Sequence, residues 1–84
     1  ISFFWEEVED VSYYQLEYSM DSKFTGEKFS KSDILFNFCN LLENQRISPG
    51  EWFWRVKAID AVGNQGLYSK VYSFEVYQEK DIEE

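Results

Sequence analysis

The sequence has no histidine, one cysteine and one proline among its 84 residues. Without histidine the chain lacks the commonest general base and the commonest metal ligand of proteins. A single cysteine, Cys39, excludes a disulfide within the chain, so the fold cannot depend on one. The sequence also contains no apolar run of about 18 residues, which a membrane-spanning helix requires.

Basic residues are scarce as well. Eight Lys and Arg stand against sixteen Asp and Glu, which gives a formal net charge of -8. Nucleic-acid binding requires a basic surface that displaces counterions from phosphates, and these few bases do not supply one. The same negative field repels anionic lipid headgroups. We therefore expect no nucleic-acid partner and no membrane insertion of this segment.

Aromatic residues are abundant, at 20% of the chain. A domain this short buries only about 60% of the surface that its unfolded chain exposes, less than a larger domain does, so large rings must supply much of its core. The apolar share of 44% and the charged share of 29% are typical of a folded protein. Because the chain starts at Ile1 and has no signal peptide, we expect it to be a segment of a longer protein.

Apolar residues recur at every second position in five segments, which predicts five half-buried strands. These segments are residues 1–5, 14–18, 34–38, 52–58 and 72–76. A shorter sixth strand is expected at residues 27–30, and turn residues cluster at 6–10, 21–26, 48–50 and 63–66. Only residues 41–45 have helical character, and five residues are too few for a helix without tertiary support. Many short strands without helices predict an all-β sandwich or small barrel.

The period of two also assigns aromatic side chains to the two faces of the strands. The inward set is Trp5, Tyr14, Tyr18, Phe36, Trp54 and Phe74. The opposite face carries Tyr13, Phe53 and Tyr77, together with Glu17, Arg55 and Glu75.

Four aromatic-rich motifs follow one another along residues 1–76. They are Trp5, Tyr14-Gln15-Leu16-Glu17-Tyr18, Trp52-Phe53-Trp54-Arg55-Val56-Lys57-Ala58 and Ser73-Phe74-Glu75-Val76. This series resembles the fibronectin type III domain, particularly the versions in bacterial surface and secreted proteins. The resemblance implies an immunoglobulin-like antiparallel β-sandwich, in which residues 52–58 lie between residues 14–18 and 72–76 in one sheet. In that strand order Glu17, Arg55 and Glu75 would form an acid–base–acid ladder across the sheet.

The chain departs from that family pattern in three places. Trp52 stands where the family usually has a tyrosine whose hydroxyl ties down the preceding loop; an indole N–H can donate in the same way but cannot accept. The segment at residues 41–49 is longer than the turn that the family usually has at this place. The family's first strand is also missing: either it lies upstream in the longer protein, or one strand edge of the domain is left unpaired. The resemblance thus implies a fibronectin type III-like domain at residues 1–77 and an acidic tail or linker at 78–84.

The sequence offers no set of residues suited to catalysis. Catalysis requires a nucleophile with a base, a metal, or two carboxyls with separated pKa values. Cys39 has no histidine partner, and we expect it to be a small buried or half-buried thiol. Acids at residues 6–10, with Asp21 or Asp60, leave Ca²⁺ binding open as an alternative, although no Ca²⁺-loop spacing is present. We predict no enzyme, no cofactor and no resident metal.

The candidate contact surface consists of three aromatics and one loop. It comprises Tyr13, Phe53 and Tyr77 and the loop residues Gly63, Asn64, Gln65 and Gly66. Exposed aromatics stack on sugars or anchor a partner domain, and loops on a rigid scaffold often carry recognition. Ordinary cross-strand packing is the alternative explanation of the three rings. We expect residues 6–10 to lie at the opposite edge of the domain from this surface.

The sequence therefore predicts a non-catalytic, fibronectin type III-like module of a larger extracellular or cell-surface protein. Such a module spaces other domains of the same polypeptide, or contacts them or another protein. Two alternatives stay open. One is a carbohydrate-binding accessory module of a secreted enzyme, with a glycan on exposed aromatics, which a flat row of exposed tryptophans would favour. The other is a periplasmic sensor domain of a bacterial signalling protein, which a downstream membrane helix would favour.

Overall fold

The computed structural model describes residues 1–41 and 47–77, and in these ranges all regular structure is β. The strands are β1 (Ser2–Phe4), β2 (Tyr13–Ser19), β3 (Phe29–Ile34), β4 (Phe38–Asn40), β5 (Gly50–Ile59) and β6 (Tyr72–Val76). No helix long and apolar enough to cross a membrane occurs in these two ranges. The predicted helical segment lies outside the described residues except for Leu41, and the predicted tail at 78–84 lies outside them entirely.

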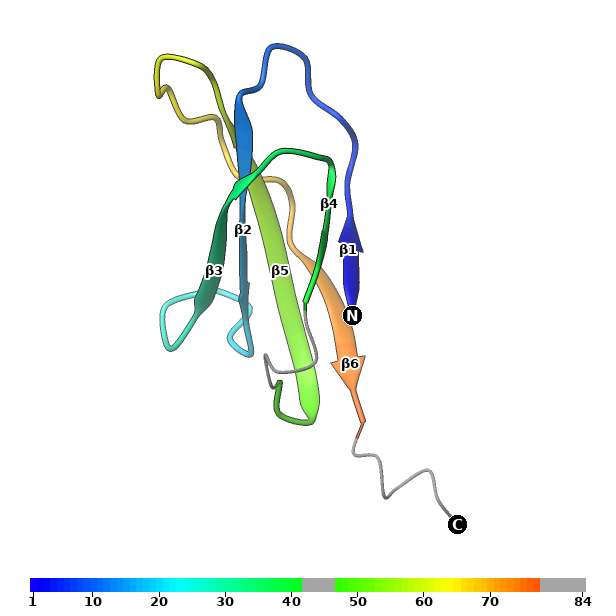
Figure 1. The fold of residues 1–84 in the computed structure, drawn as a ribbon. Coiled ribbons are helices and arrows are strands. Elements are labelled where there is room, and N and C mark those ends of the chain that lie inside the picture. Colours follow the sequence, from blue (N-terminus) through cyan, green and yellow to red (C-terminus); the bar gives the residue numbers. More distant parts are fainter. Residues whose placement is uncertain (42–46, 78–84) are drawn as a thin grey trace.

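The six strands form two antiparallel sheets. The larger sheet has the order β3-β2-β5-β6, and the smaller sheet pairs β1 with β4. The chain passes from the larger sheet to the smaller one between β3 and β4 (Figure 1). This sandwich-like arrangement confirms the predicted all-β class.

The core lies between the two sheets and is built from aromatic rings. The ring centroid of Phe3 in β1 lies 5.1 Å from that of Trp54, 5.4 Å from that of Phe74 and 6.3 Å from that of Tyr18. The buried core residues are Phe3, Tyr14, Leu16, Tyr18, Leu41, Trp52, Trp54 and Val56. The predicted inward side chains Tyr14, Tyr18 and Trp54 are therefore confirmed, and Trp5 and Phe74 pack half-buried against the same core.

The predicted strand at residues 34–38 is wrong, because two strands meet there. Ile34 ends β3, Phe38 begins β4, and the residues between them cross from one sheet to the other. Phe36 lies in this crossover and is 65% exposed rather than inward. In β4, Cys39 faces the core opposite Phe3, whereas Phe38 is exposed. A period of two cannot reveal this change of sheet, because the apolar positions 34, 36 and 38 continue the alternation through the crossover itself.

The predicted short strand at 27–30 overlaps only the first two residues of a longer strand, β3, which runs from Phe29 to Ile34. Its pairing with β2 changes register: Tyr14 pairs with Ile34, but Leu16 pairs with Lys31. One extra residue on β3 therefore forms a β-bulge, and Asp33 within it has a positive φ of 59°. Bulges bend a strand and increase its twist. This one lies just before the chain leaves the larger sheet.

The start of β5 is held by one side-chain hydrogen bond and one glycine. The indole N–H of Trp52 donates to the carbonyl of Ser48 at 2.9 Å, so it ties down the preceding loop as the sequence suggested. Gly50 has a φ of 134°, which side-chain-bearing residues rarely adopt. A Cβ at Gly50 would also lie 2.7 Å from the terminal methyl group of Met20.

Candidate functional site

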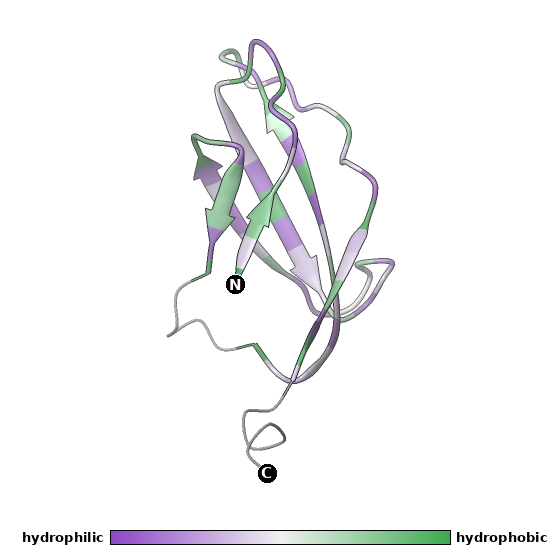
Figure 2. Ribbon diagram, turned by 90° about the vertical axis from the view of Figure 1, so that its right-hand side faces the viewer, coloured by the Kyte–Doolittle hydropathy of each residue, from purple (hydrophilic) through white to green (hydrophobic). Residues whose placement is uncertain are grey.

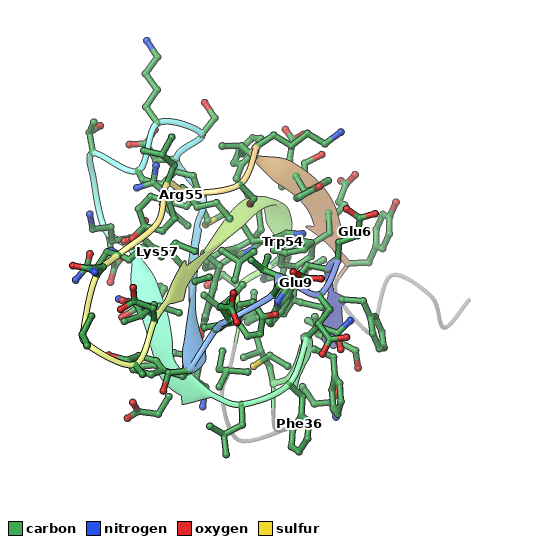
Figure 3. All side chains as sticks on the ribbon, turned by 90° about the horizontal axis from the view of Figure 1, so that it is seen from above. Glu6, Glu9, Phe36, Trp54, Arg55 and Lys57 are labelled. Atoms are coloured by element: carbon green, nitrogen blue, oxygen red, sulfur yellow. The ribbon has the colours of Figure 1, made fainter. Side chains whose placement is uncertain are left out.

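The face of the larger sheet that points away from the smaller sheet, here called the outer face, carries an arginine between two aromatic rings. The guanidinium carbon of Arg55 lies 4.2 Å from the ring centroid of Phe24 and 3.9 Å from that of Tyr68. Figure 3 shows Arg55 and Lys57 on the opposite side of β5 from Trp54. Phe24 comes from the β2–β3 loop and Tyr68 from the β5–β6 connection, so two loops are anchored on one side chain.

Tyr68 is placed by its neighbour in the chain. The backbone N–H of Ser69 donates to the carbonyl of Val56 at 2.7 Å, and its hydroxyl accepts from the N–H of Val56 at 3.0 Å. These two bonds hold the β5–β6 connection beside β5. The contacts of Phe24 and Tyr68 with Arg55 were not predicted from the sequence, because neither aromatic residue belongs to an alternating segment. Tyr68-Ser69 is part of the family resemblance, but the resemblance gave Tyr68 no partner.

Glu17 is the charged partner of Arg55 in this cluster. Its carboxylate lies 2.6 Å from Nη2 of Arg55 and 3.5 Å from Nζ of Lys28, although Glu17 is only 5% exposed. A buried carboxylate is tolerated when it is paired and hydrogen-bonded in this way. The Glu17–Arg55 step of the predicted ladder is thus confirmed. The Glu75 step is wrong, because Glu75 pairs with Glu51 and the β5–β6 pairing ends at Trp54 and Tyr72.

The structure does not gather the three predicted surface aromatics into one patch. Tyr13 and Phe53 are half-buried, and Tyr77 is exposed. Tyr13 pairs with Ile59, six residues along β5 from Phe53, which is roughly 20 Å at about 3.3 Å per residue. Phe53 pairs with Ser19 and Ser73, and thus lies near the other end of β5.

The predicted loop, residues 63–66, is a tight turn built on Asp60. The Asp60 carboxylate accepts from the backbone N–H groups of Asn64 at 2.8 Å and Val62 at 3.1 Å. These bonds, that of Asn64 first, lower the pKa of Asp60. Gly63 supplies the left-handed conformation of the turn with a φ of 91°. The side-chain oxygen of Gln65 accepts from Nζ of Lys57 in β5 at 2.6 Å, so this polar group of the loop is bonded to the sheet.

Residues 6–10 lie at the same end of the domain as this turn, which corrects the expected placement at the opposite edge (Figure 1). The backbone N–H of Ser12 donates to the carbonyl of Ile59 at 2.8 Å. Asp10 and Asp60 line one shallow depression together with Val62. The reason is the pairing: β2 and β5 are antiparallel neighbours, so β2 begins where β5 ends.

Among the described residues, no three His, Cys, Asp or Glu side chains gather into a group that could hold a metal ion. Asp21 and Asp60 cannot share an ion, because they follow antiparallel neighbours and lie at opposite ends of the larger sheet. The Asp21 carboxylate accepts from the backbone N–H groups of Lys23, Thr25 and Gly26. These bonds, with the hydroxyl of Thr25, hold the pKa of Asp21 well below its usual value.

Cys39 is a half-buried thiol, as predicted. Burial raises its pKa, so the thiol stays protonated at neutral pH and is a poor nucleophile.

Comparison of the chain with protein-family models, with curated proteins and with solved structures gives no match in any of the three.

Proposed function

We propose that this chain is a non-catalytic, fibronectin type III-like module of a larger extracellular or cell-surface protein, which spaces other domains or contacts them or another protein. The strand order β3-β2-β5-β6 is the observation that carries the proposal. The strand with the Tyr-x-Leu-x-Tyr motif and the strand with the closing Phe-Glu-Val motif flank β5, which bears Trp-x-Trp-Arg-Val-x-Ala. This is the neighbourhood that the sequence resemblance implies.

The free edge of β1 also supports the proposal. The backbone N–H of Leu41 donates to Ile1, that of Trp5 donates to Asn37, and Phe3 pairs with Cys39. Because alternate residues of an antiparallel strand bond to the same neighbour, the backbone groups of Ser2 and Phe4 point to the other edge. No strand of the described residues pairs there. The first strand of a fibronectin type III-like domain would pair at this edge.

The tryptophans favour a spacer or contact module over a carbohydrate-binding module. Trp52 and Trp54 are buried, and Trp5 packs half-buried against the core. A glycan platform requires exposed ring faces, which these side chains do not offer. The indole Nε1 of Trp5 is buried and has no hydrogen-bond partner within residues 1–41 and 47–77. Its ring packs against those of Tyr14 and Trp54 in the larger sheet, with centroid distances of 5.3 Å and 6.3 Å.

Chemical-shift mapping tests the proposed contact role. The ¹⁵N-labelled chain would be titrated with neighbouring domains of the longer protein, and separately with soluble glycans and with Ca²⁺. A contact module should show shifts at Phe53 and at residues 63–66 upon addition of a domain. Shifts at residues 6–10 that a chelator abolishes would favour Ca²⁺ binding instead, and shifts with glycans alone would favour the accessory-module alternative. A chain without any shifts would be a passive spacer.

A further inference from the structure

Three phenylalanine side chains are exposed in a row on the smaller sheet and its crossover. Phe4 is 67% exposed, Phe36 is 65% exposed and Phe38 is 41% exposed. Phe38 is the middle member, with its ring centroid 6.1 Å from that of Phe4 and 5.8 Å from that of Phe36. Figure 2 shows hydrophobic residues in β1 and β4, and Figure 3 shows Phe36 at the periphery, far from Trp54. We call this row the phenylalanine face.

A row of this size points to a contact surface. Three largely exposed phenylalanine rings present a few hundred Å² of contiguous apolar surface, since an aromatic side chain buries about 150–250 Å² when covered. Soluble monomers rarely expose larger apolar patches, and a patch at this limit is often functional. Because the core lies on the opposite side of β1 and β4, these rings do not contribute to it.

The polar side chains that alternate with the rings are already hydrogen-bonded to the protein. The hydroxyl of Ser2 donates to the side-chain oxygen of Asn40, and the side-chain amide of Asn37 donates to the carbonyl of Trp5 at 2.8 Å. A sugar ligand needs free donors and acceptors around the stacking ring to bind its hydroxyl groups. The phenylalanine face therefore suits an apolar protein surface better than a glycan.

Acidic residues border the phenylalanine face at one end. Glu6, Glu7, Glu9 and Asp10 begin two residues after Phe4, and all four are exposed. The backbone N–H of Trp5 donates to the carbonyl of Asn37 at 3.1 Å, which holds the start of this acidic run beside the crossover that bears Phe36. A second copy of the chain would bring the same acids and a second net charge of -8. Repulsion thus disfavours self-association and favours a basic partner.

We propose that the phenylalanine face docks an amphipathic, basic segment of another protein. Apolar side chains of the segment cover Phe4, Phe36 and Phe38, and its Lys or Arg side chains meet the acids of residues 6–10. The apolar contact supplies most of the affinity, and the charges set orientation and association rate. This surface lies on the smaller sheet, and the proposal does not depend on the proposed fibronectin type III-like function.

Two synthetic peptides with equal apolar content test the proposal. A Leu/Lys amphipathic peptide and a Leu/Glu counterpart would each be titrated into the ¹⁵N-labelled chain at low ionic strength. The Leu/Lys peptide should shift the amides of residues 36–38 and 6–10 and bind at least tenfold more tightly than the Leu/Glu peptide. Its Kd should rise severalfold between low and physiological salt, because the exposed charges are screened.

Matched variants locate the contact. Phe36→Ser changes an exposed side chain outside the strands and should weaken Leu/Lys binding about tenfold, while circular dichroism confirms an unchanged fold. A triple variant with Glu6, Glu7 and Glu9 changed to Gln should weaken binding and flatten its salt dependence. Leu67→Ser, at an equally apolar position that is 95% exposed in the β5–β6 connection, should leave binding unchanged.

Three results would overturn the proposal. The first is equal binding of the two peptides, and the second is unchanged binding by the Phe36→Ser variant. The third is concentration-dependent dimerisation of the free chain that Phe36→Ser abolishes, because the face would then serve a second copy. None of these results bears on contacts at Phe53 or residues 63–66, so the two proposals fail separately.

Discussion

Successive side chains of β5 belong to two different environments. Trp52, Trp54 and Val56 point into the aromatic core between the sheets, whereas Arg55 lies on the outer face between Phe24 and Tyr68. The inner contacts are apolar and depend on close packing. The outer contacts depend on the positive charge of the Arg55 guanidinium, which makes cation–π contacts with two rings and an ion pair with Glu17. Substitutions at neighbouring positions should therefore destabilise the domain for different reasons.

Trp54→Ala should reduce the free energy of unfolding by about 3–5 kcal/mol, because removal of a large buried ring leaves a cavity. Trp54 is 8% exposed, and its ring centroid lies 4.8 Å from that of Tyr72. A small domain has about 5–15 kcal/mol of stability, so the variant should be close to unfolding. Urea denaturation measures the loss, with Phe4→Ala as an exposed control that should change little. A loss below about 1 kcal/mol for Trp54→Ala would contradict the inward orientation.

Glu17 and Arg55 should show a larger coupling energy than an exposed ion pair. Exposed pairs contribute about 0.2–1 kcal/mol, whereas the Glu17 side chain is only 7% exposed. A double-mutant cycle of Glu17→Ala and Arg55→Ala, followed by urea denaturation, measures the coupling. Lys28→Ala removes the more exposed partner of the same carboxylate and should change stability by less than about 0.5 kcal/mol. Equal effects of Lys28→Ala and Arg55→Ala would contradict the role of Arg55.

At the scale of elements, two loops have the same construction at opposite ends of the larger sheet. Each begins with an aspartate just after a strand, Asp21 after β2 and Asp60 after β5. In both loops the carboxylate accepts hydrogen bonds from backbone N–H groups two to five residues further on. Such bonds shape a turn and stabilise the ionised carboxylate. Both loops should therefore respond to acid.

Acid should destabilise the domain through Asp21 and Asp60, because folding lowers the pKa of both groups. Their contribution is complete above the unfolded-state pKa of about 3.9, and it is lost as the pH falls through the lower folded-state value. Urea denaturation between about pH 2 and pH 6 should thus show falling stability below about pH 4. Asp60→Asn should flatten this fall, and the double variant with Asp21→Asn should flatten it further. If the stability of Asp60→Asn fell with pH as steeply as that of the unsubstituted chain, the turn would not depend on the charge of Asp60.

At the scale of the whole molecule, we expect the chain to hydrolyse no glycoside, ester, peptide or phosphate substrate. Cys39 keeps its proton, and the lowered pKa values of Asp21 and Asp60 make these carboxylates weak bases at neutral pH. A panel of chromogenic substrates measures turnover, with the Asp60→Asn variant alongside. Turnover that disappears upon substitution of a single carboxylate would overturn the non-catalytic function.

The alternation of apolar residues by itself determined the all-β class, the strands β2, β5 and β6, and the inward faces of Tyr14, Tyr18 and Trp54. It did so because a strand points successive side chains to opposite faces whichever strand pairs beside it. The Glu17–Arg55 contact was predicted from parity together with the strand order that the family resemblance implied, and both residues do lie on the same face of neighbouring strands.

Only the tertiary structure decided where the chain changes sheet and what covers the outer face. Phe36 fits the inward pattern of its segment, yet the crossover from β3 to β4 places it in solvent. Phe24 and Tyr68 lie in loops without any period, and each packs on Arg55 from a different loop. The shared end of residues 6–10 and 63–66 follows from the pairing of β2 with β5. Each of these features depends on contacts between distant segments, which local alternation cannot specify.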